Sequence, residues 1–506
     1  GNFTGVASGI TGTPNITVAI MTATSFNGDG SSLTGIAATN WIANNVTANS
    51  SSTAIDLSLG NVIKFTQSAN TTVSFANTGT SNVVSFIRRN GTGTITWPSA
   101  IKWDGGSAPT LNSTVYSNDT NVITLLTRDE GVTWYGWENS SVSGGYEMWA
   151  WGRNNNGGLG QNNTTDYSSP VQVGGATWSA VSRGWSGDST GLGVKSDGTL
   201  WVWGASGQSL GQNQSPGNAA YSSPTQIGSG TDWSNNIASG SCMGAVKTDG
   251  SLWTWGANSN GKLGHNQSAS TPGKSSPTQI PGTWSTTAGS LTSGYGNMAC
   301  IRNDGSLYTW GGNNNKSLGV NLPENTGQRS SPVQVPGTWK EICGGDQGFF
   351  IGVQTNGTLW TWGWASNGVS GRGTTQRTSS PAQVPGTNWS HCSAGKQTMA
   401  IRTDGTLWGW GKNEYGHIGS NNKTVYSSPH QIPGTTWAQI CCGSGAGIAS
   451  KTDGTLWAWG RNAYGQLGQN SKTQYSSPRQ IPGTSWGTEV HHIRFAGRSS
   501  NAIKTS

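Results

Sequence analysis

The residues GGYEMWAWG at 144–152 decide how this chain folds. Elsewhere a Trp-x-Trp-Gly stretch follows a complete hairpin arm, as in GIASKTDGTLWAWG at 447–460. The copy at 148–152 has no such arm before it, whereas the last residues, SNAIKTS at 500–506, form an arm with no Trp-x-Trp-Gly after it. Joined, the two ends reproduce one complete unit. We therefore predict that the C-terminal strand pairs with the first Trp-x-Trp-Gly strand and closes a ring, which removes two free sheet edges.

The Trp-x-Trp-Gly stretch is the anchor of a repeat whose copies are spaced by 48 to 55 residues. Each copy continues with a turn-rich stretch, a Ser-Ser-Pro segment, a further Trp and a strand of small residues. Asp-Gly or Asn-Gly turns then join antiparallel strands, so each unit predicts about four short strands. Side chains alternate along a strand, which places both anchor Trp on one face. Repeated four-stranded sheets of this size predict a seven-bladed β-propeller. The anchors are MWAWG (148–152), LWVWG (200–204), LWTWG (252–256), LYTWG (307–311), LWTWG (359–363), LWGWG (407–411) and LWAWG (456–460).

Composition supports an all-β chain with almost no helix. The 506 residues include 78 Gly and 27 Trp, and only 10% are charged, compared with roughly 25% in average soluble domains. No run of 18 apolar residues occurs, so we expect no membrane insertion. No signal peptide is predicted. The chain starts at Gly1, which fits either a processed or a trimmed terminus.

The charge is divided unevenly along the chain. Residues 1–145 carry five Lys/Arg and seven Asp/Glu, a net charge of −2, whereas residues 146–506 carry 23 and 14, a net charge of +9. The basic residues of the repeats are scattered singly, and nucleic-acid binders usually cluster them. We therefore expect no nucleic-acid partner, but an electrostatic attraction to anionic surfaces.

The pattern W-G-x-N-x-x-G-x-L-G, a later Pro and a D-G-T-L-W hairpin resembles the RCC1-like repeat family of seven-bladed propellers over residues 146–506. The resemblance implies the fold strongly and the function weakly. Family members that exchange nucleotide on a small GTPase or bind chromatin act through particular loops and charged tails, and no basic tail stands out here. Other members are inhibitors or surface-binding scaffolds.

The region before the propeller is predicted to contain two parts. Residues 1–50 are rich in Gly, Thr and Asn and are interpreted as an extended arm or a particle-attachment segment. Residues 51–143 contain alternating strands between turns and predict a small β-sandwich. Two stretches, ATSFNGDGSSLTGI (23–36) and 95–137, resemble virion structural proteins of marine tailed phages. That resemblance implies attachment to other virion proteins through residues 1–143, and it allows a homo-trimer there.

The residue types that carry chemistry do not form a known catalytic or metal motif. Two Gly-x-Ser-x-Gly strings, at 187–191 and 207–211, lack the strand-turn-helix setting of a nucleophile elbow. The cysteines form no CxxC pair, so we expect no zinc site and buried free thiols. Cys392 and Cys441 both lie 12 residues before a turn Asp, which predicts equivalent positions on neighbouring blades. We expect no enzyme, no cofactor and no metal.

Aromatic residues that interrupt the repeat are the candidate binding residues. Trp364, Trp185, Tyr295 and Phe349 stand where other copies carry different residues. Exposed aromatic rings beside Asn and Gln are typical of sugar-binding surfaces. The alternative is local packing in blades of slightly different shape.

These observations lead to two functional hypotheses. In the first, the chain is a virion protein of a tailed phage, exposed on the particle as a tail fibre, head fibre or decoration, and its propeller binds a host glycan or receptor. In the second, it is a cellular or secreted interaction scaffold or inhibitor. The hypotheses differ in whether the chain purifies with particles at a fixed stoichiometry.

Overall fold

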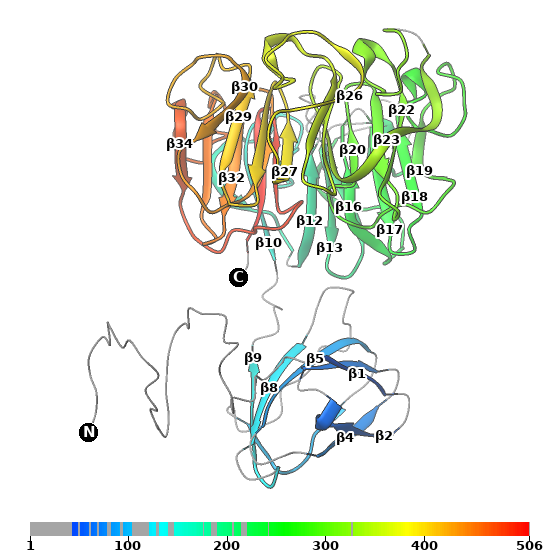
Figure 1. Cartoon of the computed structure of the whole chain (residues 1–506), viewed down its shortest axis with the longest axis vertical. Coiled ribbons are helices and arrows are strands. Elements are labelled where there is room, and N and C mark those ends of the chain that lie inside the picture. The colour runs from blue at the N-terminus through cyan, green and yellow to red at the C-terminus, as the bar shows by residue number, and fades with distance from the viewer. Residues whose placement is uncertain are drawn as a thin grey trace, which may run out of the picture.

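The computed structural model describes two β-rich units (Figure 1). The residues described are 43–48, 51–59, 62–67, 70–77, 82–91, 95–103, 121–127, 131–139 and 146–504, the last without 176, 184–189, 205–206, 214–219, 241 and 325–326. Their regular elements are strands and short 3-10 turns, which confirms the predicted all-β class. Over these residues, no helix is long and apolar enough to cross a membrane.

The N-terminal unit consists of two sheets around one core. Its buried residues include Ile55, Phe65, Val73 and Trp134 from both sheets. Strands β1, β3 and β5 pair in parallel, as do β2, β4 and β6, so successive strands alternate between the sheets. The six-stranded sheet has the order β1 (Ala43–Ala48), β3 (Val62–Gln67), β5 (Asn82–Gly91), β8 (Asn121–Thr127), β9 (Trp134–Asn139), β7 (Ile101–Trp103), and the other has the order β2 (Ser52–Asp56), β4 (Thr71–Ala76), β6 (Ile95–Thr96).

The boundary predicted at residue 51 lies too late in the chain. Strand β1 falls within the segment predicted to be an extended arm, yet it pairs with β3 over six residues. Its sequence, ANNVTA, is too polar to predict a strand. The strand forms because of its pairing with β3 and not because of its own residue types. Residues 1–42 lie outside the described part of the chain.

Seven four-stranded blades make up the second unit. One continuous strand, β23, contributes its first half to the fourth blade and its second half to the fifth. In chain order the blades are β11 (Tyr167–Gln172), β10 (Glu147–Gly152), β36 (Ser499–Lys504), β35 (Ile493–Ala496); β12 (Trp178–Arg183), β13 (Gly191–Lys195), β14 (Leu200–Gly204), β15 (Tyr221–Gln226); β16 (Trp233–Ala238), β17 (Cys242–Lys247), β18 (Leu252–Gly256), β19 (Lys274–Ile280); β20 (Leu291–Ser293), β21 (Asn297–Ile301), β22 (Ser306–Gly311), β23 (Arg329–Gly344); β23, β24 (Phe349–Gln354), β25 (Leu359–Gly363), β26 (Thr378–Gln383); β27 (Trp389–Ala394), β28 (Gln397–Arg402), β29 (Leu407–Gly411), β30 (Tyr426–Ile432); and β31 (Trp437–Cys442), β32 (Ala446–Lys451), β33 (Leu456–Gly460), β34 (Tyr475–Ile481).

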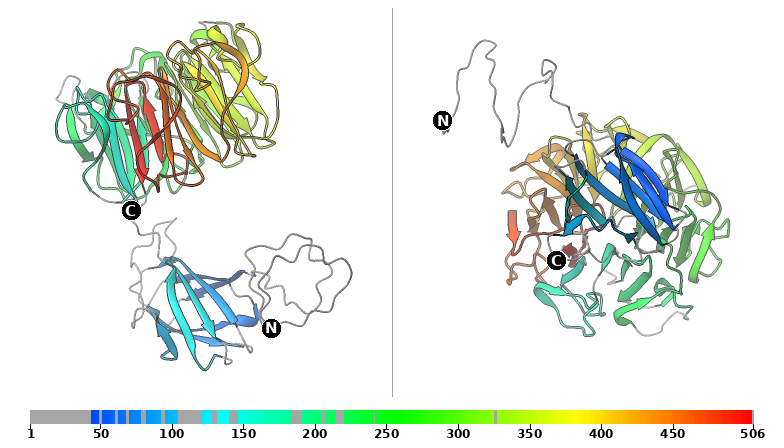
Figure 2. Two further views of the ribbon diagram at one scale, coloured as in Figure 1. Left: turned by 90° about the vertical axis from the view of Figure 1, so that its left-hand side faces the viewer. Right: turned by 90° about the horizontal axis from the view of Figure 1, so that it is seen from below.

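The first blade combines the two ends of the propeller segment. Strand β36 pairs antiparallel with β10, from Glu147 opposite Lys504 to Gly152 opposite Ser499. The first strands of the seven blades contact one another in sequence around the centre, and β35 contacts both β31 and β12 (Figure 2). This arrangement is consistent with the ring closure predicted from GGYEMWAWG and SNAIKTS.

The second Trp of each anchor joins its blade to the preceding one. In all seven copies its indole Nε1 donates to a backbone carbonyl in the loop of the neighbouring blade, at 2.9 to 3.0 Å. Trp151 donates to Gln466, a residue 315 positions away, and so repeats the contact across the seam. Two residues after Gln466, Gly468 has a φ of +67°, and a Cβ on it would lie 2.9 Å from the Trp151 Nε1. The last Gly of the W-G-x-N-x-x-G-x-L-G pattern therefore makes room for the next blade's Trp.

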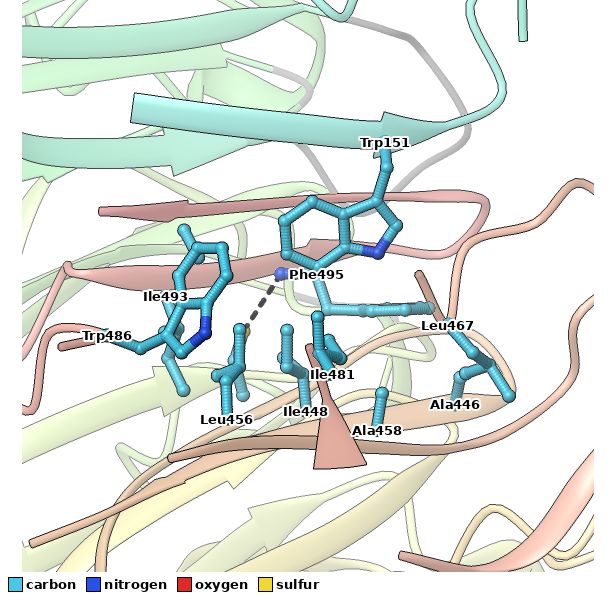
Figure 3. Packing of buried hydrophobic residues seen from close by; sticks show 12 residues of the cluster. Trp151, Ala446, Ile448, Leu456, Ala458, Leu467, Ile481, Trp486, Ile493 and Phe495 are labelled. Carbon is cyan, nitrogen blue, oxygen red and sulfur yellow. Dashed lines mark hydrogen bonds between the residues drawn. The ribbon is translucent and has the colours of Figure 1, made fainter. Parts of the chain in front are cut away.

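One buried hydrophobic cluster spans the seam between the first and seventh blades (Figure 3). Trp151 and Phe495 of the first blade are buried against Ile448 and Leu467 of the seventh. The Phe495 backbone N–H donates to the Cys441 sulfur at 3.3 Å. Burial of such large side chains is worth roughly 1.5–3 kcal/mol each, so the seam contributes substantially to stability.

Candidate functional site

The four aromatic residues predicted as a binding surface have different environments. Phe349 is only 1% exposed, because it packs inside the fifth blade, so that prediction is wrong. Tyr295, in the hairpin between β20 and β21, is 57% exposed. Trp185 lies outside the described residues. Phe349 therefore cannot belong to an exposed aromatic surface.

Trp364 is half-buried and already stacked. The guanidinium of Arg377 lies 4.2 Å from the centre of its ring, and Arg377 also forms an ion pair with Glu324. One face of Trp364 is thus covered by a side chain of the protein itself. This contact accounts for the Trp at a position where other blades carry small or basic residues.

Six of the 23 Lys and Arg residues of the propeller stack on aromatic rings of their own blade. In six blades, a Lys or Arg at or just after the end of the strand that precedes the anchor in the repeat lies over two aromatic rings, 3.9 to 5.9 Å from their centroids. In the sixth blade, for example, Arg402 lies over Trp389 and Trp408. Each such contact is worth about 0.5–2 kcal/mol. We call these residues the clamp cations; they are Lys195, Lys247, Arg302, Arg402, Lys451 and Lys504.

A second set of basic residues lies at the opposite ends of the strands. Arg153 and Arg461 follow β10 and β33, and Arg498 lies in the hairpin between β35 and β36. Arg153 and Arg498 lie 5.1 and 5.6 Å from the ring centre of Tyr464, and their backbones are hydrogen-bonded to each other. Because strands in a blade alternate in direction, all three arginines lie on one face of the ring. We call this group the arginine arc.

The arginine arc extends around the face without an acidic partner. Arg461 lies 5.3 Å from the ring centre of Tyr415, one blade further on. None of the ion pairs between described residues includes an arginine of the arc. The acid nearest to Arg153 in the loop, Asp166, accepts a hydrogen bond from the Asn154 backbone. The arc therefore combines half-exposed guanidinium groups with aromatic rings.

A central cavity is lined by the first strands of the blades. It encloses about 100 Å³ and is lined by Glu341, His391, Arg494 and several cysteines, among other residues. The His391 Nδ1 lies 3.2 Å from a Glu341 carboxylate oxygen. Burial lowers the pKa of His391, but the hydrogen bond and charge of Glu341 outweigh this, so that its pKa is raised.

The described cysteines are free thiols, as predicted, and five of the six are buried. Cys392 and Cys441 are not equivalent, however. Cys392 is paired with Ala400, and the residue that corresponds to Ala400 in the next blade is Ala449. Cys441, however, is paired with Ile448. The hairpin loop 443–445 is one residue longer than loop 395–396, which shifts the strand register by one. Counting back from the turn Asp could not detect that insertion.

The Gly-x-Ser-x-Gly string at 207–211 has a structural role in the repeat. Ser209 lies in a 3-10 turn, and its backbone carbonyl accepts the Trp255 Nε1 hydrogen bond that joins two blades. Of the other string, at 187–191, only Thr190 and Gly191 lie within the described residues.

Several copies of the repeat are similar to a known repeat family. Residues 147–186, 249–300, 356–401, 404–449 and 453–500 match the model of the Regulator of chromosome condensation (RCC1) repeat, and 437–466 match a second RCC1 repeat model. The Ultraviolet-B receptor UVR8 of Arabidopsis thaliana is 27% identical over 240 residues, which are 45% of this chain and 51% of UVR8. Human E3 ubiquitin-protein ligase HERC2 is 26% identical over 46% of this chain and 5% of its own length. The chain thus spans about half of the first relative and a small part of the second.

Solved structures have the same fold. Yeast RCC1 (Prp20), crystallised with Kap60, has a TM-score of 0.61 and 17% identity over 72% of this chain and 89% of that chain. Human WBSCR16 has a TM-score of 0.60 and 16% identity over 71% of this chain and 99% of that chain. At such identities the similarity shows the fold alone.

Proposed function

Since residues 146–506 form an RCC1-like repeat propeller, we propose that this chain is a non-enzymatic protein-interaction scaffold whose contact surface is the arginine arc. The observation that carries the proposal is the gathering of Arg153, Arg461 and Arg498 around Tyr415 and Tyr464 on one face. Arg and Tyr are enriched at protein interfaces because each offers both apolar contact area and directed hydrogen bonds.

The chemistry of the arc favours an acidic partner. Each guanidinium lies over a Tyr ring and so has a pre-organised position, while its N–H groups can bond a carboxylate in two places. Clamp cations are unsuited to that role because each already lies over two aromatic rings. The three arginines of the arc therefore contribute a local positive charge on their face that can attract an acidic partner.

Binding to an acidic probe tests the proposal. The probe is a library of random ten-residue peptides rich in Asp and Glu, with its Lys/Arg-rich counterpart as the reversed-charge control. We expect the triple variant R153Q/R461Q/R498Q to lose about tenfold in affinity for the acidic peptides, as three partly exposed ion pairs would contribute. Arg479→Gln is the matched control, because Arg479 also lies over a Tyr, at 5.1 Å, but on the outer strand β34. Equal affinities of the unmodified chain, the triple variant and Arg479→Gln for the acidic peptides would refute the arc as the contact surface.

A second proposal places the scaffold on a phage particle. It is supported by the similarity of 23–36 and 95–137 to virion proteins and by the separate β-rich unit before the propeller. In that case the N-terminal part attaches to other virion proteins and the propeller is exposed to a host glycan or receptor. Immunogold labelling of purified particles with antibody against 146–506 tests it. Label at the tail indicates receptor binding, and label over the head indicates decoration. Unlabelled particles would contradict this second proposal and favour a scaffold that is not part of a particle.

A further inference from the structure

We propose that Glu341, Cys343 and Cys392 form a binding site for one Zn²⁺ ion between the fifth and sixth blades. Glu341 and Cys343 lie on β23, and Cys392 lies on β27, the first strand of the next blade. All three line the central cavity. The site is distinct from the arginine arc, and its test does not depend on any protein partner.

The geometry of the three side chains is close to that of a zinc site. Their ligand atoms, one carboxylate oxygen and two sulfurs, all lie within 4.8 Å of one another. Tetrahedral Zn²⁺ has bonds of about 2.0 Å to oxygen and 2.3 Å to sulfur, which place its ligand atoms roughly 3.5–3.8 Å apart. Side-chain rotations that move each ligand atom by less than a bond length would thus bring the three groups around one ion.

The donor set selects the metal. Two thiolates favour a soft or borderline ion over Mg²⁺ and Ca²⁺, which prefer oxygen alone. The carboxylate of Glu341 is hydrogen-bonded to His391 at 3.2 Å, and a partner of that kind orients a ligand toward its metal. The fourth position would be taken by water from the cavity.

A metal ion can reach the site from the central cavity. Cys392 is only 2% exposed and directs its sulfur toward the Ile351 carbonyl of the fifth blade, 3.7 Å away. Cys343 is half-buried, and its sulfur lies 3.3 Å from the Cys392 backbone oxygen. An ion that enters through the cavity would meet Cys343 first. It would then link two strands that belong to different blades.

Proton release is the main cost of binding. Zinc binds Cys as the thiolate. It must therefore displace thiol protons, and binding should strengthen as the pH rises.

The test uses the full chain under reducing conditions, with Co²⁺ as a spectroscopic substitute for Zn²⁺. We expect one Co²⁺ per chain, a sulfur-to-cobalt charge-transfer band, loss of that band on addition of Zn²⁺, and a higher melting temperature with Zn²⁺. Cys343→Ala should remove the charge-transfer band or weaken cobalt binding at least tenfold, and Glu341→Gln should weaken it less.

Cys300→Ala is the matched control, because Cys300 is fully buried in β21, where it does not line the cavity. It should bind Co²⁺ as the unmodified chain does. Far-ultraviolet circular dichroism shows whether each variant is folded, and a variant that fails to fold is replaced by the corresponding Ser. Absence of cobalt binding by the reduced chain would overturn the proposal. So would binding that Cys343→Ala and Cys343→Ser leave unchanged, or a Cys343–Cys392 disulfide whose reduction yields no metal binding.

Discussion

The clamp cations and the arginine arc show how the same residue types serve two purposes in one ring. The clamp cations recur at the same place in six blades, and each lies over two aromatic rings. Among the described residues, the arc lies where the sixth, seventh and first blades meet, and each of its arginines lies over a single Tyr. A contact that is repeated in six of the seven blades stabilises the ring, whereas a contact that occurs once is free to be specific. Recurrence within one chain can therefore separate structural from functional residues without an alignment of relatives.

Removal of residues 495–506 should have the largest effect on the repeated framework. Without β36, β10 and β35 lose their common partner, and the seam between the first and seventh blades is exposed. We expect the melting temperature to fall by on the order of 10 °C or more, measured by calorimetry. A fall of less than a few degrees would contradict the closure of the ring by the C-terminal strand.

Trp410→Ala should destabilise a blade junction away from the seam. Trp410 is fully buried and donates a hydrogen bond to Val369 of the preceding blade. Loss of a buried Trp of this kind costs about 3–5 kcal/mol, which urea unfolding would measure. Trp408→Ala is the control, since Trp408 is only partly buried and its indole donates within its own blade, to Thr406, so its loss should cost less. Equal losses would contradict a special role for the second Trp of the anchor.

Acid should weaken the ring through two buried histidines. Burial lowers the pKa of His417 and of His492 to about 4. Because these pKa values lie below the ordinary value, the stability that depends on the neutral rings is present above pH 6.5 and is lost as the pH falls toward 4. The loss is on the order of 3 kcal/mol per histidine.

Asp346 acts in the opposite direction and must be separated from this effect. Burial raises its pKa to about 6, so its negative charge destabilises the fold above that pH and protonation between about pH 6 and pH 4 favours the fold. Urea unfolding at pH 7 and pH 4.5 should show a net loss in the unmodified chain, a smaller loss in His417→Gln and a larger loss in Asp346→Asn. An unfolding midpoint independent of pH in all three would contradict the assignment.

The sequence predicted the propeller well because its repeat carries the determining contacts. The second Trp of each anchor and the last Gly of the W-G-x-N-x-x-G-x-L-G pattern can both be recognised in the sequence, and they are in contact at every blade junction. Joining 144–152 to 500–506 was possible because the missing arm and the extra arm are recognisable halves of one unit. Strand β1 was missed because a polar strand at a sheet edge has no apolar alternation.

The candidate sites were harder to predict because they combine residues from different repeats. Cys343 and Cys392 are 49 residues apart and meet only because their strands are neighbours around the cavity. Phe349 was misplaced because an aromatic residue that departs from the repeat looks the same in sequence whether it is exposed or packed in the blade. The arginine arc had one visible signal. Arg153, Lys412 and Arg461 follow the anchors of three neighbouring blades, where other blades carry Ala, Gly or Trp.

The most direct test compares Arg402→Gln, a clamp variant, with Arg461→Gln, an arc variant, in parallel measurements of melting temperature and acidic-peptide affinity. We predict that Arg402→Gln loses about 1 kcal/mol of stability and binds as the unmodified chain does. Arg461→Gln should melt as the unmodified chain does and lose a few-fold in affinity. The opposite result, in which the clamp variant loses binding or the arc variant loses only stability, would contradict the division between a repeated framework and a single contact surface.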